Sequence, residues 1–209
     1  MTEQRTEDWF ADRLGKVTAS KIADVMATTK SGYSATRANY MAQLVCERLT
    51  GEREQGYCNA AMQRGTDLEP QARAMYEFHT GNSVVETGFV SHPTIAMCGA
   101  SPDGLVGEDG LVEIKVPNTA THIATLRGGG IDDRYIKQMH LQMLCTGRKW
   151  CDFVSFDDRL PEPMQLHIER VPLDVDLAVK MEAEVVKFLA ELDATVADLT
   201  NRYLMKEAA

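Results

Sequence analysis

The sequence has no apolar stretch as long as a membrane-spanning helix, which needs about 20 consecutive apolar residues. Its N-terminal segment, MTEQRTEDWF, is charged and lacks the apolar run of a secretory signal. The five cysteines are odd in number and contain no Cys-x-x-Cys pair, which argues against both a disulfide framework and a zinc site. We therefore expect a protein of the reducing cytoplasm, with no membrane partner.

The sequence also lacks an excess of basic residues, although most DNA-binding modules are basic. It carries 31 acidic residues against 22 Lys and Arg, a formal net charge of −9 at pH 7. Much of the acid lies in residues 173–199, where seven Asp or Glu accompany two lysines. An acidic outer helix leaves the basic residues elsewhere to steer DNA, and a bound cation inverts the charge of a carboxylate site locally. The composition is compatible with a nuclease but does not indicate one.

Length and patterning predict one mixed α/β domain over residues 1–209. That length suffices for one domain with a full-sized core, and no repeat or low-complexity linker divides it. Helical signals fill about residues 5–80, strand signals dominate about 84–171, and an acidic helix covers about 173–200. Helices followed by a meander, a helix and further strands are typical of a mixed sheet flanked by helices.

Local signals predict the ends of several elements. Thr6, Thr18 and Ser34 are candidate helix N-caps, and Gly15, Gly51 and Gly81 are candidate helix ends. Helices are expected to start after Thr6, Thr18 and Ser34 and to cover residues 67–80, 134–146 and 173–199. Strands are expected over residues 84–90, 95–100, 105–106, 111–116, 151–156 and 165–171.

The most informative spacing joins Asp103, Glu113 and Lys115. The turn residues 107–110 predict a β-hairpin, which brings Asp103 at the start of one strand close to Glu113 within the next. Glu113 and Lys115 are two residues apart on a strand and project from one face, whereas Ile114 points into the core. Two acids and a lysine on one face are costly unless compensated. Mg²⁺ compensates them, because it takes one or two carboxylates plus water and phosphate oxygens.

A second interpretation of these three residues is structural. Glu113 and Lys115 would form a solvated pair, and Asp103 would be a turn residue. The strongly apolar alternate face and the rigid Ser-Pro-Asp-Gly turn, which fixes the direction of the Asp103 side chain, favour the metal site instead. Lys115 would then orient or help deprotonate the attacking water and stabilise charge on the phosphorus oxygens.

The combination SPDG…EIKVP resembles the active-site signature of the PD-(D/E)xK nucleases. Its detailed form is similar to the phage lambda exonuclease, or YqaJ-like viral recombinase, family. Three further segments resemble motifs of that family, namely WFADRLGKVTAS, RGTDLEPQARAMYEFHTG and YIKQMHLQ. Together the motifs cover about residues 9–160, while the acidic tail helix is similar only in character. The resemblance implies a restriction-endonuclease-like core with a helical N-terminal part.

The resemblance also implies roles for the residues around the hairpin. Asp103 and Glu113 correspond to the principal metal ligands, with the backbone carbonyl of Ile114 contributing. Lys115 corresponds to the catalytic lysine, and Glu69 to an outer metal-site acid. The implied cofactor is Mg²⁺, with Mn²⁺ as a substitute. Without the resemblance, Glu69 is an exposed acid on a helix.

One glutamine matches the family as well. Gln138 corresponds to a residue that contacts the metal site or the scissile region. Taken alone, Gln138 and Gln142 are four residues apart on one helix edge with Tyr135, and such edges are usually solvated. Met139 and Met143 on the same helix are expected in the core. His122 and His140 have no ligand-like spacing and receive no metal role.

A third set of residues resembles the family's pocket for a 5′-phosphate. Arg13, Ser20 and Ser101 suit that role, since arginine offers a fork to phosphate and hydroxyls add donors. Met62 matches an apolar wedge that splits the terminal base pair, and Arg127 begins a flexible, partly basic stretch that would touch the DNA backbone. The structural alternatives are a helix C-terminal arginine, two serines at a helix start and a turn, and a core methionine.

The resemblance implies an exonuclease that degrades the 5′-ended strand of double-stranded DNA and leaves 3′ overhangs for recombination by strand annealing. It further implies a ring-shaped homotrimer acting on duplex ends, partnered by a phage single-strand annealing protein, and a phage- or prophage-encoded origin in a bacterial cytoplasm. Two alternatives stay open: an endonuclease on the same fold, of restriction or repair type, and a catalytically silent DNA-binding module.

Overall fold

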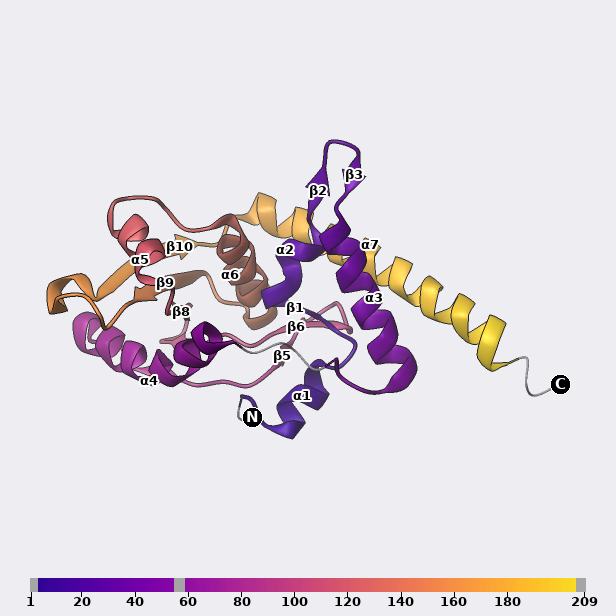
Figure 1. Ribbon diagram of the computed structural model, residues 1–209, viewed down its shortest axis with the longest axis horizontal. Coiled ribbons are helices and arrows are strands. Elements are labelled where there is room, and N and C mark those ends of the chain that lie inside the picture. The colour runs from indigo at the N-terminus through magenta and orange to yellow at the C-terminus, as the bar shows by residue number, and fades with distance from the viewer. Residues whose placement is uncertain (1–3, 55–58, 206–209) are drawn as a thin grey trace.

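The computed structural model describes residues 4–54 and 59–205, which form helices packed around mixed sheets (Figure 1). The α-helices are α1 (Glu7–Arg13), α2 (Ile22–Val25), α3 (Ala35–Thr50), α4 (Ala60–Thr80), α5 (Thr119–Leu126), α6 (Asp133–Thr146) and α7 (Val175–Leu199). Single turns of other helix types are η1 (Ala19–Lys21), η2 (Glu162–Met164) and η3 (Thr200–Leu204). The mixed α/β fold expected from the sequence is confirmed.

The strands are short at the N-terminal side and longer towards the C-terminus. They are β1 (Val17–Thr18), β2 (Thr28–Thr29), β3 (Gly32–Tyr33), β4 (Val84–Val85), β5 (Val90–Ser91), β6 (Cys98–Ala100), β7 (Gly104–Val106), β8 (Gly110–Lys115), β9 (Trp150–Phe156) and β10 (Leu166–Pro172). The main sheet of the described residues has the order β10-β9-β8-β7-β4, and a smaller one has the order β1-β6-β5. β8 pairs antiparallel with β7 and parallel with β9.

Two helices cover the two faces of the main sheet. Ala72 and Tyr76 of α4 pack against one face, on Val112 and Ile114 of β8. Met139 and Met143 of α6 pack against the other, on residues that include Leu111, Cys151 and Phe153. In Figure 1 these helices lie on opposite sides of β8 and β9. Ile114 and the two methionines are therefore in the core, as predicted.

Most predicted caps are confirmed. The Thr6 and Ser34 side chains accept from the N–H groups of Trp9 and Arg37, at 3.3 and 3.4 Å. Gly51 and Gly81 end α3 and α4 in the left-handed conformation, with φ of +71° and +70°. Thr18 stands at the N-cap position of η1, as predicted, but its side chain makes no capping hydrogen bond. Thr18 also belongs to β1, which pairs with Cys98 and Gly99 of β6.

Two boundaries also differ from prediction. α4 begins at Ala60 rather than at residue 67, because the Asn59 side chain caps it by accepting from Met62 N at 2.9 Å. The apolar run 84–90 is not one strand. Its ends pair with different sheets, β4 with β7 and β5 with β6, and residues 86–89 cross between them.

The acidic helix α7 packs against helix α3. Phe188 stacks on Tyr40 of α3, and two α7 acids form ion pairs with arginines of α3: Glu191 with Arg37 and Asp193 with Arg48. Some of the acidic side chains of α7 are therefore engaged in ion pairs within the protein.

Candidate active site

β8 places Glu113 and Lys115 on one face of the main sheet, as the sequence predicted. Their partners in the parallel register with β9 are Phe153 and Ser155. This face is not open to solvent, because α6 packs over it. Glu113 is buried, with 1% of its surface exposed, and the Lys115 side chain keeps 24%. The solvated-pair interpretation of Glu113 and Lys115 is therefore wrong.

Glu113 is the centre of a polar network. Gln138 Nε2 donates to its Oε1 and Gln142 Nε2 donates to its Oε2, each at 2.6 Å. Lys115 Nζ also donates to Oε1. Both glutamines come from α6, one helical turn apart, so one helix edge fixes both carboxylate oxygens. The expected contact of Gln138 with the site is present. Gln142 was not predicted there, although its spacing from Gln138 was the available signal.

Asp103 lies beside this network at the start of β7. Its Oδ2 accepts the backbone N–H of Ile114 at 2.7 Å, which ties the Ser-Pro-Asp-Gly turn to β8. Burial and the Glu113 carboxylate raise the pKa of Asp103 well above its ordinary value, and Glu69 adds to this. Burial alone would lower the pKa of Lys115, but Glu113 and Asp103 outweigh it and the net pKa is raised. The pKa of Asp103 thus responds to the charges of Glu113, Lys115 and Glu69, and Lys115 is held as an ammonium.

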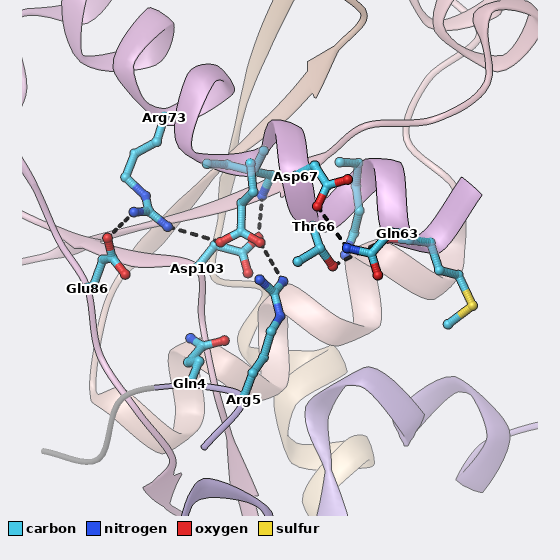
Figure 2. Close-up of polar contacts among 12 residues, drawn as sticks. Gln4, Arg5, Gln63, Thr66, Asp67, Arg73, Glu86 and Asp103 are labelled. Carbon is cyan, nitrogen blue, oxygen red and sulfur yellow. Dashed lines mark hydrogen bonds and ion pairs between the residues drawn. The ribbon is translucent and has the colours of Figure 1, made fainter. Parts of the chain in front are cut away.

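Glu69 lies on α4 and is neutralised by two arginines. Arg5 Nη2 donates to its Oε2 at 2.7 Å, and Arg73 Nη2 donates to its Oε1 at 3.0 Å. Arg73 also pairs with Glu86, so its charge is shared between two carboxylates. Arg5 gives Glu69 a second positive partner. Figure 2 shows Arg5 and Arg73 converging on this side of Asp103. Glu69 is mostly buried, with 16% of its side chain exposed, so its interpretation as an exposed helix acid is wrong.

The donor set suits a hard divalent cation. Asp103, Glu113 and Glu69 are neighbouring carboxylates, and the charges of Glu113 and Glu69 add to burial in raising the pKa of Asp103. Among the described residues no three His, Cys, Asp or Glu side chains are arranged as a ready-made metal site. Mg²⁺ does not require one, since it is usually held by one or two carboxylates with water and phosphate completing its shell. The residues therefore fit Mg²⁺ on the chemistry of their oxygens.

A cavity of about 410 Å³ lies between α1, α3 and the start of α4. Three predicted DNA-binding residues line it, Arg13, Ser20 and Met62, together with the basic residues Lys16, Lys21 and Arg53. Ser20 is exposed, with its Oγ 3.3 Å from Thr18 Oγ1. Met62 is 56% exposed, so the alternative that it is a core methionine is wrong.

Arg13 and Ser101 are in direct contact. Arg13 Nη1 donates to Ser101 Oγ at 3.1 Å, and Trp9 Nε1 donates to the same oxygen at 2.9 Å. The guanidinium also lies over the Trp9 ring, 4.2 Å from its centroid. Burial lowers the pKa of Arg13 from its ordinary value, yet arginine titrates so high that it stays charged. Because Ser101 is two residues from Asp103, the turn joins this cavity to the carboxylates.

Arg127 does not line this cavity. It is exposed and ends α5, followed by backbone hydrogen bonds from Gly128 and Gly129 to the helix. The histidines have structural partners. His122 contacts Ser155 and the Met164 carbonyl, while His140 contacts the Ile136 carbonyl and the Asp174 N–H.

Comparison with known proteins identifies the relatives of this chain. A family model described as the YqaJ-like viral recombinase domain matches residues 8–149. An alkaline exonuclease (LHK-Exo) from Laribacter hongkongensis has 57% sequence identity and a TM-score of 0.90, covering 98% of this chain and 100% of the relative. A second structure of that enzyme, in complex with dAMP, gives the same values.

More distant comparisons add the fold alone. A phage-related exonuclease from Haemophilus somnus 129PT has 16% identity and a TM-score of 0.69, over 88% of this chain and 96% of that one. No curated protein gives a significant match. Within residues 4–54 and 59–205, no helix has the length and apolar character needed to cross a bilayer.

Proposed function

Because this chain belongs to the YqaJ-like viral recombinase family, we propose that it is a Mg²⁺-dependent exonuclease that degrades the 5′-ended strand of double-stranded DNA, leaving 3′ overhangs. Family membership and 57% identity to an alkaline exonuclease support a nuclease of the exonuclease type. The polarity, the duplex substrate and the cation go beyond those relationships and rest on the site.

One observation carries the proposal: the Ser101–Asp103 turn joins a basic cavity to the buried carboxylates. Arg13 and Ser101 offer a guanidinium fork and a hydroxyl, which suit a terminal phosphate. Asp103, two residues along the chain from Ser101, would then face a phosphodiester near that end of the strand. A pocket for the end, placed beside the cleavage site, favours an exonuclease over an endonuclease.

The residues around Glu113 divide the chemical work. A bound Mg²⁺ would supply charge neutralisation and a polarised water. Asp103, Glu113 and the Ile114 carbonyl would hold it, with Glu69 as an outer acid. Gln138 and Gln142 hold the Glu113 carboxylate in place. Lys115 would orient the attacking water and stabilise charge that grows on the phosphorus oxygens.

Lys115→Ala is the decisive variant. We expect it to lose Mg²⁺-dependent cleavage and to keep binding duplex DNA, measured with Ca²⁺ in place of Mg²⁺. Unchanged cleavage would remove Lys115 from the mechanism and the proposal with it. A wild-type protein that binds DNA without cutting it would instead be a silent DNA-binding module.

Substrate topology separates the exonuclease from an endonuclease on the same fold. We expect linear duplex with 5′-phosphates to be degraded to 5′-mononucleotides and single strands, and covalently closed circles to persist. Circles cut as fast as linear DNA would establish an endonuclease. Strands labelled at either end report the polarity.

We also propose that the active form is a homotrimeric ring threaded by DNA, working beside a phage single-strand annealing protein. An acidic exterior and a basic interior would reconcile the net charge of −9 with DNA binding. Light scattering of the purified protein tests the assembly, and a monomer at micromolar concentration would contradict it.

A further inference from the structure

A buried hydrogen-bonded pair lies next to Lys115 and has no part in the mechanism above. His122 Nδ1 is 2.7 Å from Ser155 Oγ, and both side chains have no exposed surface. His122 comes from α5, whose N-cap Asn118 accepts from Thr121 N at 2.9 Å. Ser155 comes from β9 and is the register partner of Lys115 in β8. The pair therefore reaches the sheet face that carries the proposed catalytic lysine.

The direction of the hydrogen bond follows from the other ring nitrogen. His122 Nε2 lies 2.9 Å from the carbonyl oxygen of Met164, which can only accept. Nε2 therefore carries a hydrogen. In the neutral tautomer that carries its hydrogen on Nε2, Nδ1 is the acceptor. Ser155 then donates its hydroxyl hydrogen to His122, and its oxygen keeps its lone pairs for a donor.

The donor that the sheet register places beside Ser155 is Lys115. Paired residues on parallel strands share a face of the sheet, and Lys115 and Ser155 both line a cavity of about 300 Å³ between β8, β9, α5 and α6. Tyr135 lines the same cavity, and Lys115 Nζ is 4.9 Å from its ring centroid. The Lys115 side chain thus borders a cavity that the Tyr135 ring and Ser155 also line.

Glu113 is the present partner of Lys115, and a cation bound to Glu113 would compete with Lys115 for the carboxylate oxygens. Its Oε1 already receives Gln138, and its Oε2 receives Gln142. We propose that Ser155, polarised by His122, is a positioning residue that accepts the Lys115 ammonium when Glu113 takes up the cation. The inference rests on the proposed function. It specifies which residue would hold the Lys115 ammonium while that group contacts the scissile phosphate.

Thr and Val at position 155 form a matched pair of variants, equal in shape and different in the hydroxyl. We expect Ser155→Thr to keep kcat within a few-fold of the wild type. Ser155→Val should lose about 10- to 100-fold in kcat with little change in KM, the cost of a misplaced reacting group. Equal kcat values for the two variants would overturn the proposal, because a packing role affects both alike. Thermal unfolding of both checks that they fold.

A second measurement needs no turnover. In protein labelled with [ε-¹³C]lysine, the Lys115 signal is identified by its loss in Lys115→Arg. We expect added Ca²⁺ to shift this signal in Ser155→Thr as in the wild type, and to shift it differently in Ser155→Val. Identical shifts in all three would overturn the proposal. Active Lys115→Ala would refute the proposed function itself, whereas inactive Lys115→Ala with equal Thr and Val variants refutes this inference alone.

Discussion

Gln142 Nε2 lies 2.6 Å from Glu113 Oε2, while the Oε1 atom of the same glutamine is buried without a hydrogen-bond partner. The amide is thus oriented by a single contact, with its donor on the carboxylate and its acceptor unused. An unpaired buried acceptor costs about 1–3 kcal/mol. The protein bears this cost at Gln142, the residue that holds the Glu113 carboxylate.

Gln142→Leu removes this donor and keeps a side chain of similar size. We expect activity at saturating Mg²⁺ to fall by about 10-fold or more, the usual effect of losing a group that orients a metal ligand. Steady-state rates on linear duplex measure the loss. Gln71→Leu, on the exposed side of α4, is the control. A Gln142→Leu variant as active as that control would exclude a positioning role.

Arg13→Ala tests recognition of the strand end. We expect digestion from 5′-phosphorylated ends to slow by about 10- to 100-fold, the equivalent of the roughly 1.5–3 kcal/mol of a hydrogen bond to a charged group. Digestion from 5′-hydroxyl ends should change little. Lys21→Ala removes a charge from the same cavity and should slow both substrates slightly and equally. Equal slowing by Arg13→Ala on both ends would exclude a phosphate pocket.

Arg5→Gly tests whether an arginine competes with the cation for Glu69. Glycine suits this position, because Arg5 has a left-handed φ of +68°. An exposed ion pair is worth up to about 1 kcal/mol, so we expect Ca²⁺ affinity, measured by calorimetry without DNA, to rise by up to about 5-fold. Arg202→Gly, which breaks the exposed pair with Asp198, is the control. Unchanged or weaker Ca²⁺ binding would show that Arg5 does not compete.

Asp157 at the end of β9 predicts a pH dependence of stability. Burial would raise its pKa, but hydrogen bonds from Arg159 and Thr119 outweigh burial and hold the pKa below its ordinary range. A depressed pKa contributes stability above the unfolded pKa of about 3.9, and this contribution is lost as pH falls further. Asp157→Asn should destabilise the protein by about 1–3 kcal/mol at pH 7.

The same variant should differ less from the wild type at acid pH. Urea unfolding at pH 7 and pH 3 gives the two free energies of unfolding. A gap that stays constant between these pH values would contradict the assignment to Asp157. Asp158→Asn, at an exposed carboxylate beside it, controls for the general effect of removing a charge.

The parts of the fold that follow from local chemistry were predictable. Turn residues 107–110 fix the β7–β8 hairpin, and the alternation along β8 separates Ile114 from Glu113 and Lys115. Helix α5 was missed, because it is short and its main local signal is the N-cap Asn118. β1 was missed because its two residues form a strand only by pairing with β6, about 80 residues away.

The residues of the site likewise fall into those that local spacing predicts and those that only the tertiary structure reveals. Asp103, Glu113 and Lys115 follow from spacing within one hairpin. The contact of Arg5 with Glu69 joins residues 64 apart and leaves no pattern in the sequence. Gln142 had a visible spacing, but only the packing of α6 against β8 decides whether such an edge meets water or a buried carboxylate.

Helix α4 carries both Met62, at the cavity near α1, and Glu69, beside Asp103. Seven residues of α-helix rise about 10 Å, and bases in one strand of duplex DNA are spaced by about 3.4 Å. If the proposed roles of Met62 and Glu69 hold, the helix would act as a rigid spacer between the place where the strands part and the place where one strand is cut. Arg64 of the same helix pairs with Asp157 at 3.1 Å, so this spacing would be fixed by the backbone of α4 and its attachment next to β9.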